Sequence, residues 1–128
     1  MFFGVHLLLN SRDPVADRAF FRDVLEIPAI DAGEGWLIFA LPPAEMGIHP
    51  ADTPSSTTHA GQDLASGTVY LMCESLTKTV DRLSAKGVEH TPVEEAGWGV
   101  VTSIGLPGGG KLGLYEPHHP LAIAPPTP

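Results

Sequence analysis

The stretch Lys111-Leu112-Gly113-Leu114-Tyr115-Glu116-Pro117 decides the fold, because a shorter version of it occurs earlier in the same chain. Residues 45–50 read Glu-Met-Gly-Ile-His-Pro, so an apolar residue, a glycine and a second apolar residue recur in the same order, with Gly113 placed 66 residues after Gly47. Each stretch is short, largely apolar and followed by proline, which is typical of a strand. The recurrence indicates that the two halves of the chain carry the same structural unit.

The elements expected before the first of these stretches are a strand, a helix and another strand. Residues 2–10 form an apolar run whose length predicts a buried strand. Asp13 can cap a helix and Pro14 suits its first turn, and apolar residues then recur every three or four positions. Further strands are expected at 36–41 and 45–49.

The second half repeats this order. Residues 68–73 predict a strand, Ser75 can cap the helix that follows it, and Gly87 is expected to end that helix. The remaining strands are expected at 88–93, 99–106 and 111–116, the last two joined by a glycine-rich hairpin turn at 107–110. Between the halves, residues 51–67 are rich in small and polar residues without a hydrophobic period, which predicts a linker or mobile loop.

Composition limits the kinds of partner. The 128 residues suffice for one domain, and 43% of them are hydrophobic, which supports a packed core. Seven Lys and Arg residues against fifteen Asp and Glu residues give a formal charge of −8, which repels phosphate backbones and anionic lipids. We therefore expect no nucleic-acid partner and no membrane partner. The single cysteine, Cys73, and the lack of a basic region before the first apolar run favour a cytoplasmic protein.

Three motifs together resemble the vicinal oxygen chelate superfamily, which includes glyoxalase I, extradiol dioxygenases, fosfomycin-resistance enzymes and bleomycin-resistance proteins. The first motif consists of His6 with the three leucines after it, Asp13, and the run Ala19-Phe20-Phe21-Arg22-Asp23-Val24-Leu25. The second is Leu83-Ser84-Ala85-Lys86-Gly87-Val88, and the third is residues 106–117. The resemblance implies an α+β, glyoxalase-like fold, in which two βαβββ modules form curved mixed sheets around a cavity. It implies a single vicinal oxygen chelate domain at 1–118, with module 1 at about 1–50 and module 2 at about 68–118, followed by a proline-rich tail at 119–128.

The resemblance also implies four positions at which enzymatic members hold a divalent metal. Imidazole and carboxylate groups suit such metals because they bind Zn, Ni, Mn and Fe. Only His6 matches this pattern, since the other positions fall on Gly47, on Thr68 or Val69, and on Gly113. We therefore expect no metal cofactor at the standard site. The alternative is a divalent metal on a non-standard set, namely His6, Glu45, His49 and Glu116, although strand alternation puts Glu116 on the face opposite Tyr115.

The expected site is then a ligand cavity, with His6, His49, Trp98 and Tyr115 as candidate binding residues. His49 and Tyr115 occupy equivalent positions in the two halves, and Trp98 can either stack on a planar ligand or fill the end of the barrel. The predicted function is a glyoxalase/bleomycin-resistance-like protein that binds an unidentified small molecule, and whether it also catalyses a reaction stays open. The alternatives are a metal-dependent lyase, isomerase or extradiol-dioxygenase-like enzyme built around His6, and an interaction module with a collapsed cavity. The resemblance further implies a homodimer.

Overall fold

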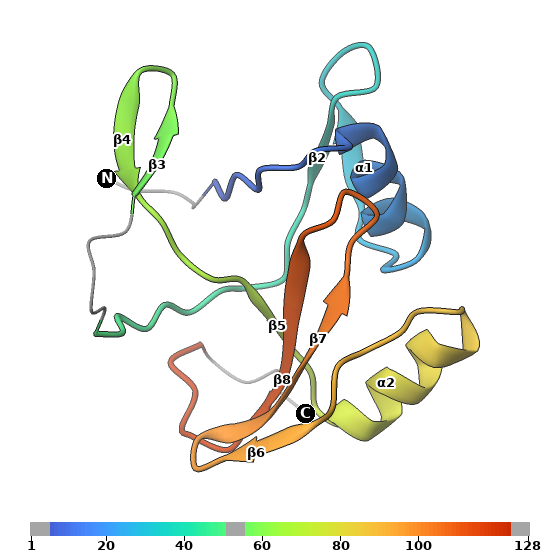
Figure 1. Cartoon of the computed structure of the whole chain (residues 1–128), viewed down its shortest axis with the longest axis vertical. Helices are drawn as coiled ribbons and strands as arrows, with labels where there is room; N and C mark the ends of the chain where they lie inside the picture. The colour runs from blue at the N-terminus through green and yellow to red at the C-terminus, as the bar shows by residue number, and fades with distance from the viewer. Residues whose placement is uncertain (1–5, 51–55, 124–128) are drawn as a thin grey trace.

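The computed structural model describes residues 6–50 and 56–123. Over these residues the chain forms two helices and eight short strands (Figure 1). In chain order the elements are α1 (Pro14–Asp23), β1 (Ala29–Asp31), β2 (Leu37–Phe39), β3 (Ser56–His59), β4 (Gln62–Ala65), β5 (Tyr70–Met72), α2 (Leu76–Ala85), β6 (Glu94–Ala96), β7 (Gly99–Gly105) and β8 (Lys111–Pro117). The class is α+β, as the resemblance implies. Within the described ranges no helix is long and apolar enough to span a bilayer.

The main sheet comes entirely from the second half of the chain. Its four strands lie in the order β5-β8-β7-β6, with β5 parallel to β8 and the other neighbours antiparallel. The elements β5, α2, β6, β7 and β8 therefore form a βαβββ unit, and α2 lies beside this sheet (Figure 1). The predicted strand at 88–93 is reduced to an isolated bridge between His90 and Ile104, and the pairing strand β6 begins just after it.

The core lies between α2 and one face of the main sheet, and Phe21 of α1 and Ile27 also belong to it. Ile104 of β7 and Leu112 of β8 are opposite each other in the register and are each only 1% exposed. Leu76, Val80 and Leu83 form the buried side of α2, at the three- and four-residue spacing of an amphipathic helix. The alternate residues of β8 face the other way, so one face of the sheet is left for the site.

Both helices begin as the sequence predicts, and α2 also ends as predicted. The Asp13 carboxylate accepts a hydrogen bond from the backbone N–H of Ala16, and Pro14 lies in the first turn of α1. The Ser75 hydroxyl accepts one from the backbone N–H of Lys78 and so caps α2. Gly87 follows α2 with a φ of +80°, the left-handed conformation that commonly ends a helix.

The first half departs from the predicted pattern. After α1 it forms only the antiparallel hairpin of β1 and β2. Residues 6–10 and 45–49 are not strands, and residues 2–5 of the first expected strand lie outside the described residues. A strand needs hydrogen bonds from a neighbouring strand, and neither stretch has such a neighbour among the described residues. The sequence repeat therefore does not produce the same local structure twice.

The expected linker is partly ordered. Residues 51–55 lie outside the described residues, but β3 and β4 form an antiparallel hairpin that stands away from the main sheet (Figure 1). Its turn uses Ala60 and Gly61, both with positive φ, which matches the right-handed twist of a two-residue hairpin. The Thr58 hydroxyl donates to the Asp63 carboxylate across the hairpin, at 2.7 Å. These strands are polar and exposed on both faces, so no hydrophobic period marks them.

Asp17 connects α1 with the turn between β7 and β8. Its side chain is almost buried, at 9% exposure. One carboxylate oxygen accepts the backbone N–H of Gly108 at 2.7 Å, and the other accepts the Ser11 hydroxyl at 2.6 Å. The first half of the chain is thus fixed to the hairpin of the second half by a carboxylate with defined partners.

Candidate small-molecule site on the open face of the main sheet

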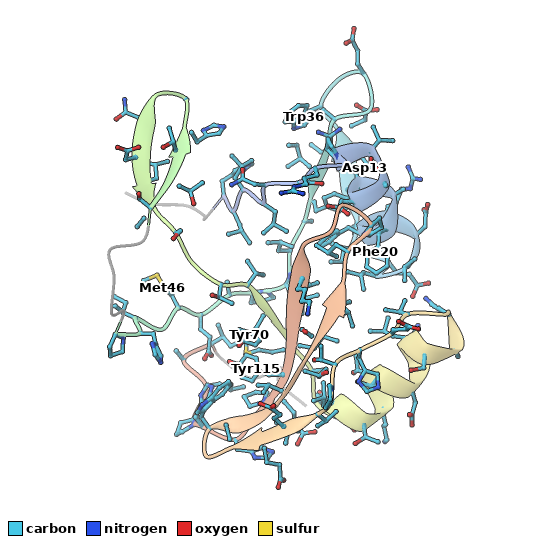
Figure 2. The ribbon with its side chains drawn as sticks, in the orientation of Figure 1. Asp13, Phe20, Trp36, Met46, Tyr70 and Tyr115 are labelled. Atoms are coloured by element: carbon cyan, nitrogen blue, oxygen red, sulfur yellow. The ribbon has the colours of Figure 1, made fainter. Side chains whose placement is uncertain are left out.

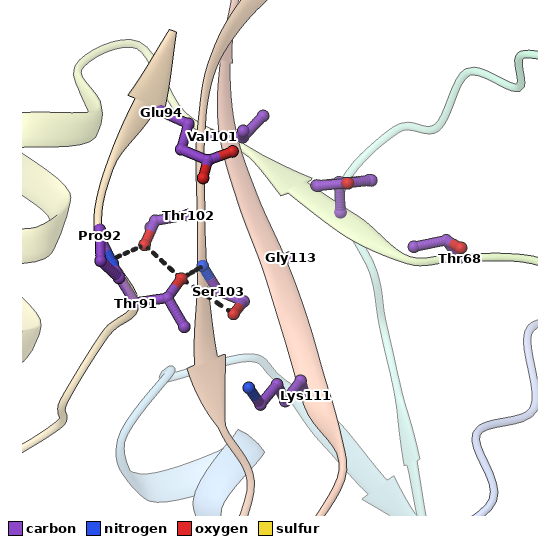
Figure 3. A pocket seen from close by; sticks show the side chains of 10 residues that line it. Thr68, Thr91, Pro92, Glu94, Val101, Thr102, Ser103, Lys111 and Gly113 are labelled. Atoms are coloured by element: carbon purple, nitrogen blue, oxygen red, sulfur yellow. Dashed lines mark hydrogen bonds between the residues drawn. The ribbon is translucent and has the colours of Figure 1, made fainter. Parts of the chain in front are cut away.

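The open face of the main sheet is the face that α2 does not cover. It carries Lys111, Gly113 and Tyr115 of β8, together with Val101 and Ser103, which lie opposite Tyr115 and Gly113 on β7. A shallow pocket of about 320 Å³ lies on this face, and Figure 3 shows it extending from Glu94 at one end to Lys111 at the other.

Gly113 is covered by the ring of Tyr70. Tyr70 is opposite Gly113 in the parallel pairing of β5 and β8, and a Cβ atom at position 113 would collide with that ring. A glycine inside a strand often allows close approach of another group, and at Gly113 that group is the Tyr70 ring. Gly47 differs, because a Cβ atom there would meet nothing within 4 Å.

Tyr70 belongs to an aromatic cluster with Trp98 and Tyr115. The ring centroids are 5.4 Å apart for Tyr70 and Tyr115, 5.5 Å for Trp98 and Tyr115, and 6.3 Å for Tyr70 and Trp98, all in edge-to-face contact. Tyr70 is 41% exposed and Trp98 is 45% exposed. Figure 2 shows Tyr70 and Tyr115 close together, with Trp36 far away beside α1. The structure therefore brings two of the candidate residues together and adds Tyr70, which sequence reasoning missed.

Tyr115 also contacts the segment that follows β8. Its hydroxyl lies 3.3 Å from Nε2 of His119, and the other ring nitrogen of His119 lies 2.8 Å from the carbonyl oxygen of Pro120. With Nδ1 donating to that carbonyl, Nε2 is the acceptor for the Tyr115 hydroxyl. Burial raises the pKa of Tyr115, and the negative charge of Glu45 raises it further, so the hydroxyl stays neutral and acts as a hydrogen-bond donor. His119 is the second residue that sequence reasoning did not place at the site.

A network of three hydroxyl groups lies along the pocket (Figure 3). Thr91 Oγ1 is 3.1 Å from both Thr102 Oγ1 and Ser103 Oγ, and it accepts the backbone N–H of Ser103 at 2.9 Å. The Thr102 hydroxyl donates to the Thr91 carbonyl oxygen at 2.6 Å. These bonds hold residue 91 against β7 and fix the polar wall of the pocket.

The four residues of the alternative metal set lie apart. His6 and His49 are exposed, and Nδ1 of His49 contacts the carbonyl oxygen of Pro50 at 2.6 Å. One oxygen of Glu45 accepts the backbone N–H of Ala122, and the other lies 4.0 Å from Nε2 of His119. In residues 6–50 and 56–123 no three His, Cys, Asp or Glu side chains are grouped so that they could hold a metal ion. This arrangement does not fit a metal on that set.

Glu116 has a structural role on the far side of the sheet. Its Oε1 accepts the backbone N–H of Leu76, the first residue of α2, at 3.0 Å, and its Oε2 lies 2.8 Å from Nε2 of His118. The hydrogen bond from His118, followed by the one from Leu76, lowers the pKa of Glu116. Glu116 therefore faces α2, on the side that strand alternation predicts, while Tyr115 faces the site.

Solved structures of other proteins share this fold. TnmS3, an antibiotic binding protein from Streptomyces sp. CB03234, is similar over 91% of this chain and 98% of its own, with a TM-score of 0.60 and 17% identity. A lactoylglutathione lyase from Agrobacterium tumefaciens matches over 84% and 88%, with a TM-score of 0.55 and 19% identity. The fosfomycin resistance protein FosX from Listeria monocytogenes matches over 91% and 94%, with a TM-score of 0.54 and 18% identity.

At these identities the likeness establishes the fold. The chain has the α+β fold that is found in the glyoxalase/bleomycin resistance/dioxygenase superfamily, which confirms the fold that the resemblance implies. No family sequence model and no curated protein sequence matches the chain.

Proposed function

We propose that the chain binds a small molecule on the open face of its main sheet. The observation that carries this proposal is the aromatic cluster, in which Tyr70 and Trp98 remain about half exposed beside a pocket of about 320 Å³. Ligand sites combine partly exposed aromatic surface with a few polar groups, and this face has both. TnmS3, which is named as an antibiotic binding protein, has the same fold and supports binding as the function.

Tryptophan fluorescence tests the proposal directly, because the chain has only two tryptophans. Trp36 lies away from the site, beneath the guanidinium of Arg18 at 4.4 Å from the ring centroid, so Trp36→Phe leaves Trp98 as the reporter. A screen of aromatic small molecules should yield ligands that change the Trp98 emission. Adding Tyr70→Ala should weaken their binding about tenfold, which corresponds to ~1.4 kcal/mol. Ligands that bind equally well without the Tyr70 ring would contradict the proposal.

We propose that this binding needs no divalent metal. The standard positions carry only His6, and the alternative ligands are held elsewhere: Glu116 by the backbone of α2 and Glu45 by Ala122. Metal analysis of the purified chain and of His6→Ala should therefore give the same content. One metal per chain in the wild type, lost in the His6→Ala variant, would favour the enzymatic alternative instead.

We also propose a homodimer, as the resemblance implies. The two stretches that lack a neighbouring strand expose five large apolar side chains, namely Leu7, Leu8, Leu9, Met46 and Ile48. Exposed apolar surface of this kind is typical of protein contact sites. Sedimentation at micromolar concentration should give a mass of about twice the 13.5 kDa of one chain, and a species of one chain's mass would contradict the proposal.

A further inference from the structure

Lys111 is the basic residue that the main sheet presents to the pocket. The other six Lys and Arg residues are Arg12, Arg18, Arg22, Lys78, Arg82 and Lys86, and all of them lie within or next to a helix. Lys111 begins β8 and lines the pocket on the open face (Figure 3). Its ammonium group forms no ion pair with the described residues. In a chain with a charge of −8, an unpaired cation on the binding face offers a place for an acidic group.

Ser103 adds a hydrogen-bond donor next to Lys111. Ser103 lies opposite Gly113 in the register, two residues along β8 from Lys111, and both side chains line the same two hollows. Three hydroxyl hydrogens belong to the network on this wall. The Thr102 hydrogen goes to the Thr91 carbonyl, and the Thr91 hydrogen has the oxygens of Thr102 and Ser103 as partners. In the 3.1 Å contact between Thr91 Oγ1 and Ser103 Oγ either hydroxyl can donate, and when Thr91 donates the Ser103 hydrogen is available to a ligand.

The pocket has a basic end and an acidic end. Glu94 lies at the end opposite Lys111, where a carboxylate repels an anion (Figure 3). Glu89 and His90 line the second hollow, which also contains Lys111, but Glu89 makes no ion pair with it. Between the two ends lie Gly113 and the exposed ring of Tyr70. Lys111 and Tyr115 are four positions apart on β8, a span of roughly 13 Å along a strand.

We propose that the ligand of this face carries a carboxylate or a similar acidic oxygen group, which Lys111 and Ser103 bind, and an apolar ring that packs against Tyr70. This inference rests on the proposed binding function and adds the chemical class of the ligand. A charge-assisted hydrogen bond between an ammonium and a carboxylate is stronger than a neutral one, so the acidic group supplies both affinity and orientation.

Three probes of one shape test the inference. They are para-nitrohydrocinnamate, its uncharged amide, and the amine of the same chain length, each titrated calorimetrically into the intact chain at low salt. The acid should bind about tenfold more tightly than the amide, which corresponds to ~1.4 kcal/mol, and the amine should bind least. In Lys111→Met the acid and the amide should bind alike. Lys78→Met is the matched control, since Lys78 lies on α2, which packs on the other face, and this variant should keep the preference for the acid.

The outcomes separate the two proposals. If the acid and the amide bind alike in the wild type, or if Lys111→Met keeps the preference, the ligand class is wrong while the binding function stands. Tighter binding of the amine would also overturn the acidic class. If none of the three probes binds at millimolar concentration while the fluorescence screen yields ligands, the ligand class is wrong; if the screen yields none either, the proposed binding function itself is contradicted. Ser103→Ala removes one hydroxyl and retains the Lys111 charge. This variant should bind the acid about threefold more weakly than the wild type, a smaller loss than in Lys111→Met.

Discussion

Replacing Asp17 with alanine should lower the free energy of unfolding substantially, because this side chain joins the two halves of the chain. The Asp17 carboxylate accepts the Gly108 backbone N–H at 2.7 Å and the Ser11 hydroxyl at 2.6 Å, and it is only 9% exposed. Hydrogen bonds to a charged group contribute about 1.5–3 kcal/mol each, and a donor left unsatisfied adds a desolvation cost. Since Ser11 lies nearer the surface, we expect Asp17→Ala to lower the free energy of unfolding by about 2–4 kcal/mol and Ser11→Ala by about 1 kcal/mol.

Gly108 supplies a matched test from the other side of this contact. A Cβ atom at Gly108 would lie 2.6 Å from both the Asp17 carboxylate and the Ser11 hydroxyl, whereas a Cβ atom at Gly110 would meet nothing within 4 Å. Gly108→Ala should therefore cost about 1–3 kcal/mol by overpacking. Gly110→Ala in the same turn should be neutral or stabilising by up to about 1 kcal/mol, because alanine restricts the unfolded chain.

Urea unfolding at a fixed protein concentration measures all four variants. With a urea slope of about 2 kcal/mol per M, Asp17→Ala should lower the midpoint by roughly 1–2 M without a change in slope. The Asp17→Ala, Gly108→Ala double variant should lose less stability than the sum of the single variants, because both remove the same contact. A cost below about 0.5 kcal/mol for Asp17→Ala, or equal effects of Gly108→Ala and Gly110→Ala, would refute this account of how the halves are joined.

Three further predictions concern α2 and its surroundings. Ser75→Ala removes the cap of α2 and should cost about 0.5–2 kcal/mol in urea unfolding, while Ser84→Ala on the same helix should cost almost nothing; equal costs would exclude a capping role. The pKa of Glu116 is lowered from its ordinary value of 4.5 in the folded state, so its stabilising effect is present above pH 4.5 and is lost as the pH falls through the folded pKa. Glu116→Gln should therefore have a lower free energy of unfolding than the wild type at pH 7, and this difference should disappear as the pH falls below 4.5. A difference that grows in acid would show that folding raises the pKa of Glu116 instead. Burial raises the pKa of the Cys73 thiol, so its alkylation at pH 8 should be several times slower in the folded chain than in urea, and equal rates would show that this thiol is accessible.

The parts of the fold that the sequence predicts well are those decided by local chemistry. Asp13 and Ser75 cap helices because their side chains reach the first free backbone N–H groups, and Gly87 adopts a positive φ at the end of α2. β8 is also predictable from the sequence, because apolar residues alternate along it, and two of them, Leu112 and Leu114, are buried in the structure. These signals act within a few residues, so periodicity and residue type suffice to predict them.

The parts that the sequence predicts poorly depend on partners far along the chain. Residues 6–10 are as apolar as a buried strand, but a strand also needs a neighbour, and composition does not reveal whether one is present. Tyr70 belongs to the aromatic cluster because the parallel pairing of β5 with β8 puts it opposite Gly113, 43 residues away. His119 reaches Tyr115 through a turn in a stretch that is rich in proline, where no periodicity applies. Trp98 and Tyr115 were identifiable as candidates, but their contact depends on the same long-range register.

The position of β8 between β5 and β7 has a consequence for synthesis on the ribosome. Among the residues that the structure describes, β5 has β8 as its single neighbour in the sheet. The paired residues Tyr70 and Gly113 are separated in sequence by α2, β6 and β7. A nascent chain that ends before Lys111 therefore exposes β5 without a neighbour and leaves the buried side of α2 without Leu112 and Leu114. Long-range pairings of this kind form late, because the intervening loop must close first. The sheet is completed only once β8 has emerged, so a growing chain that has not yet reached β8 exposes apolar surface of the kind that promotes aggregation.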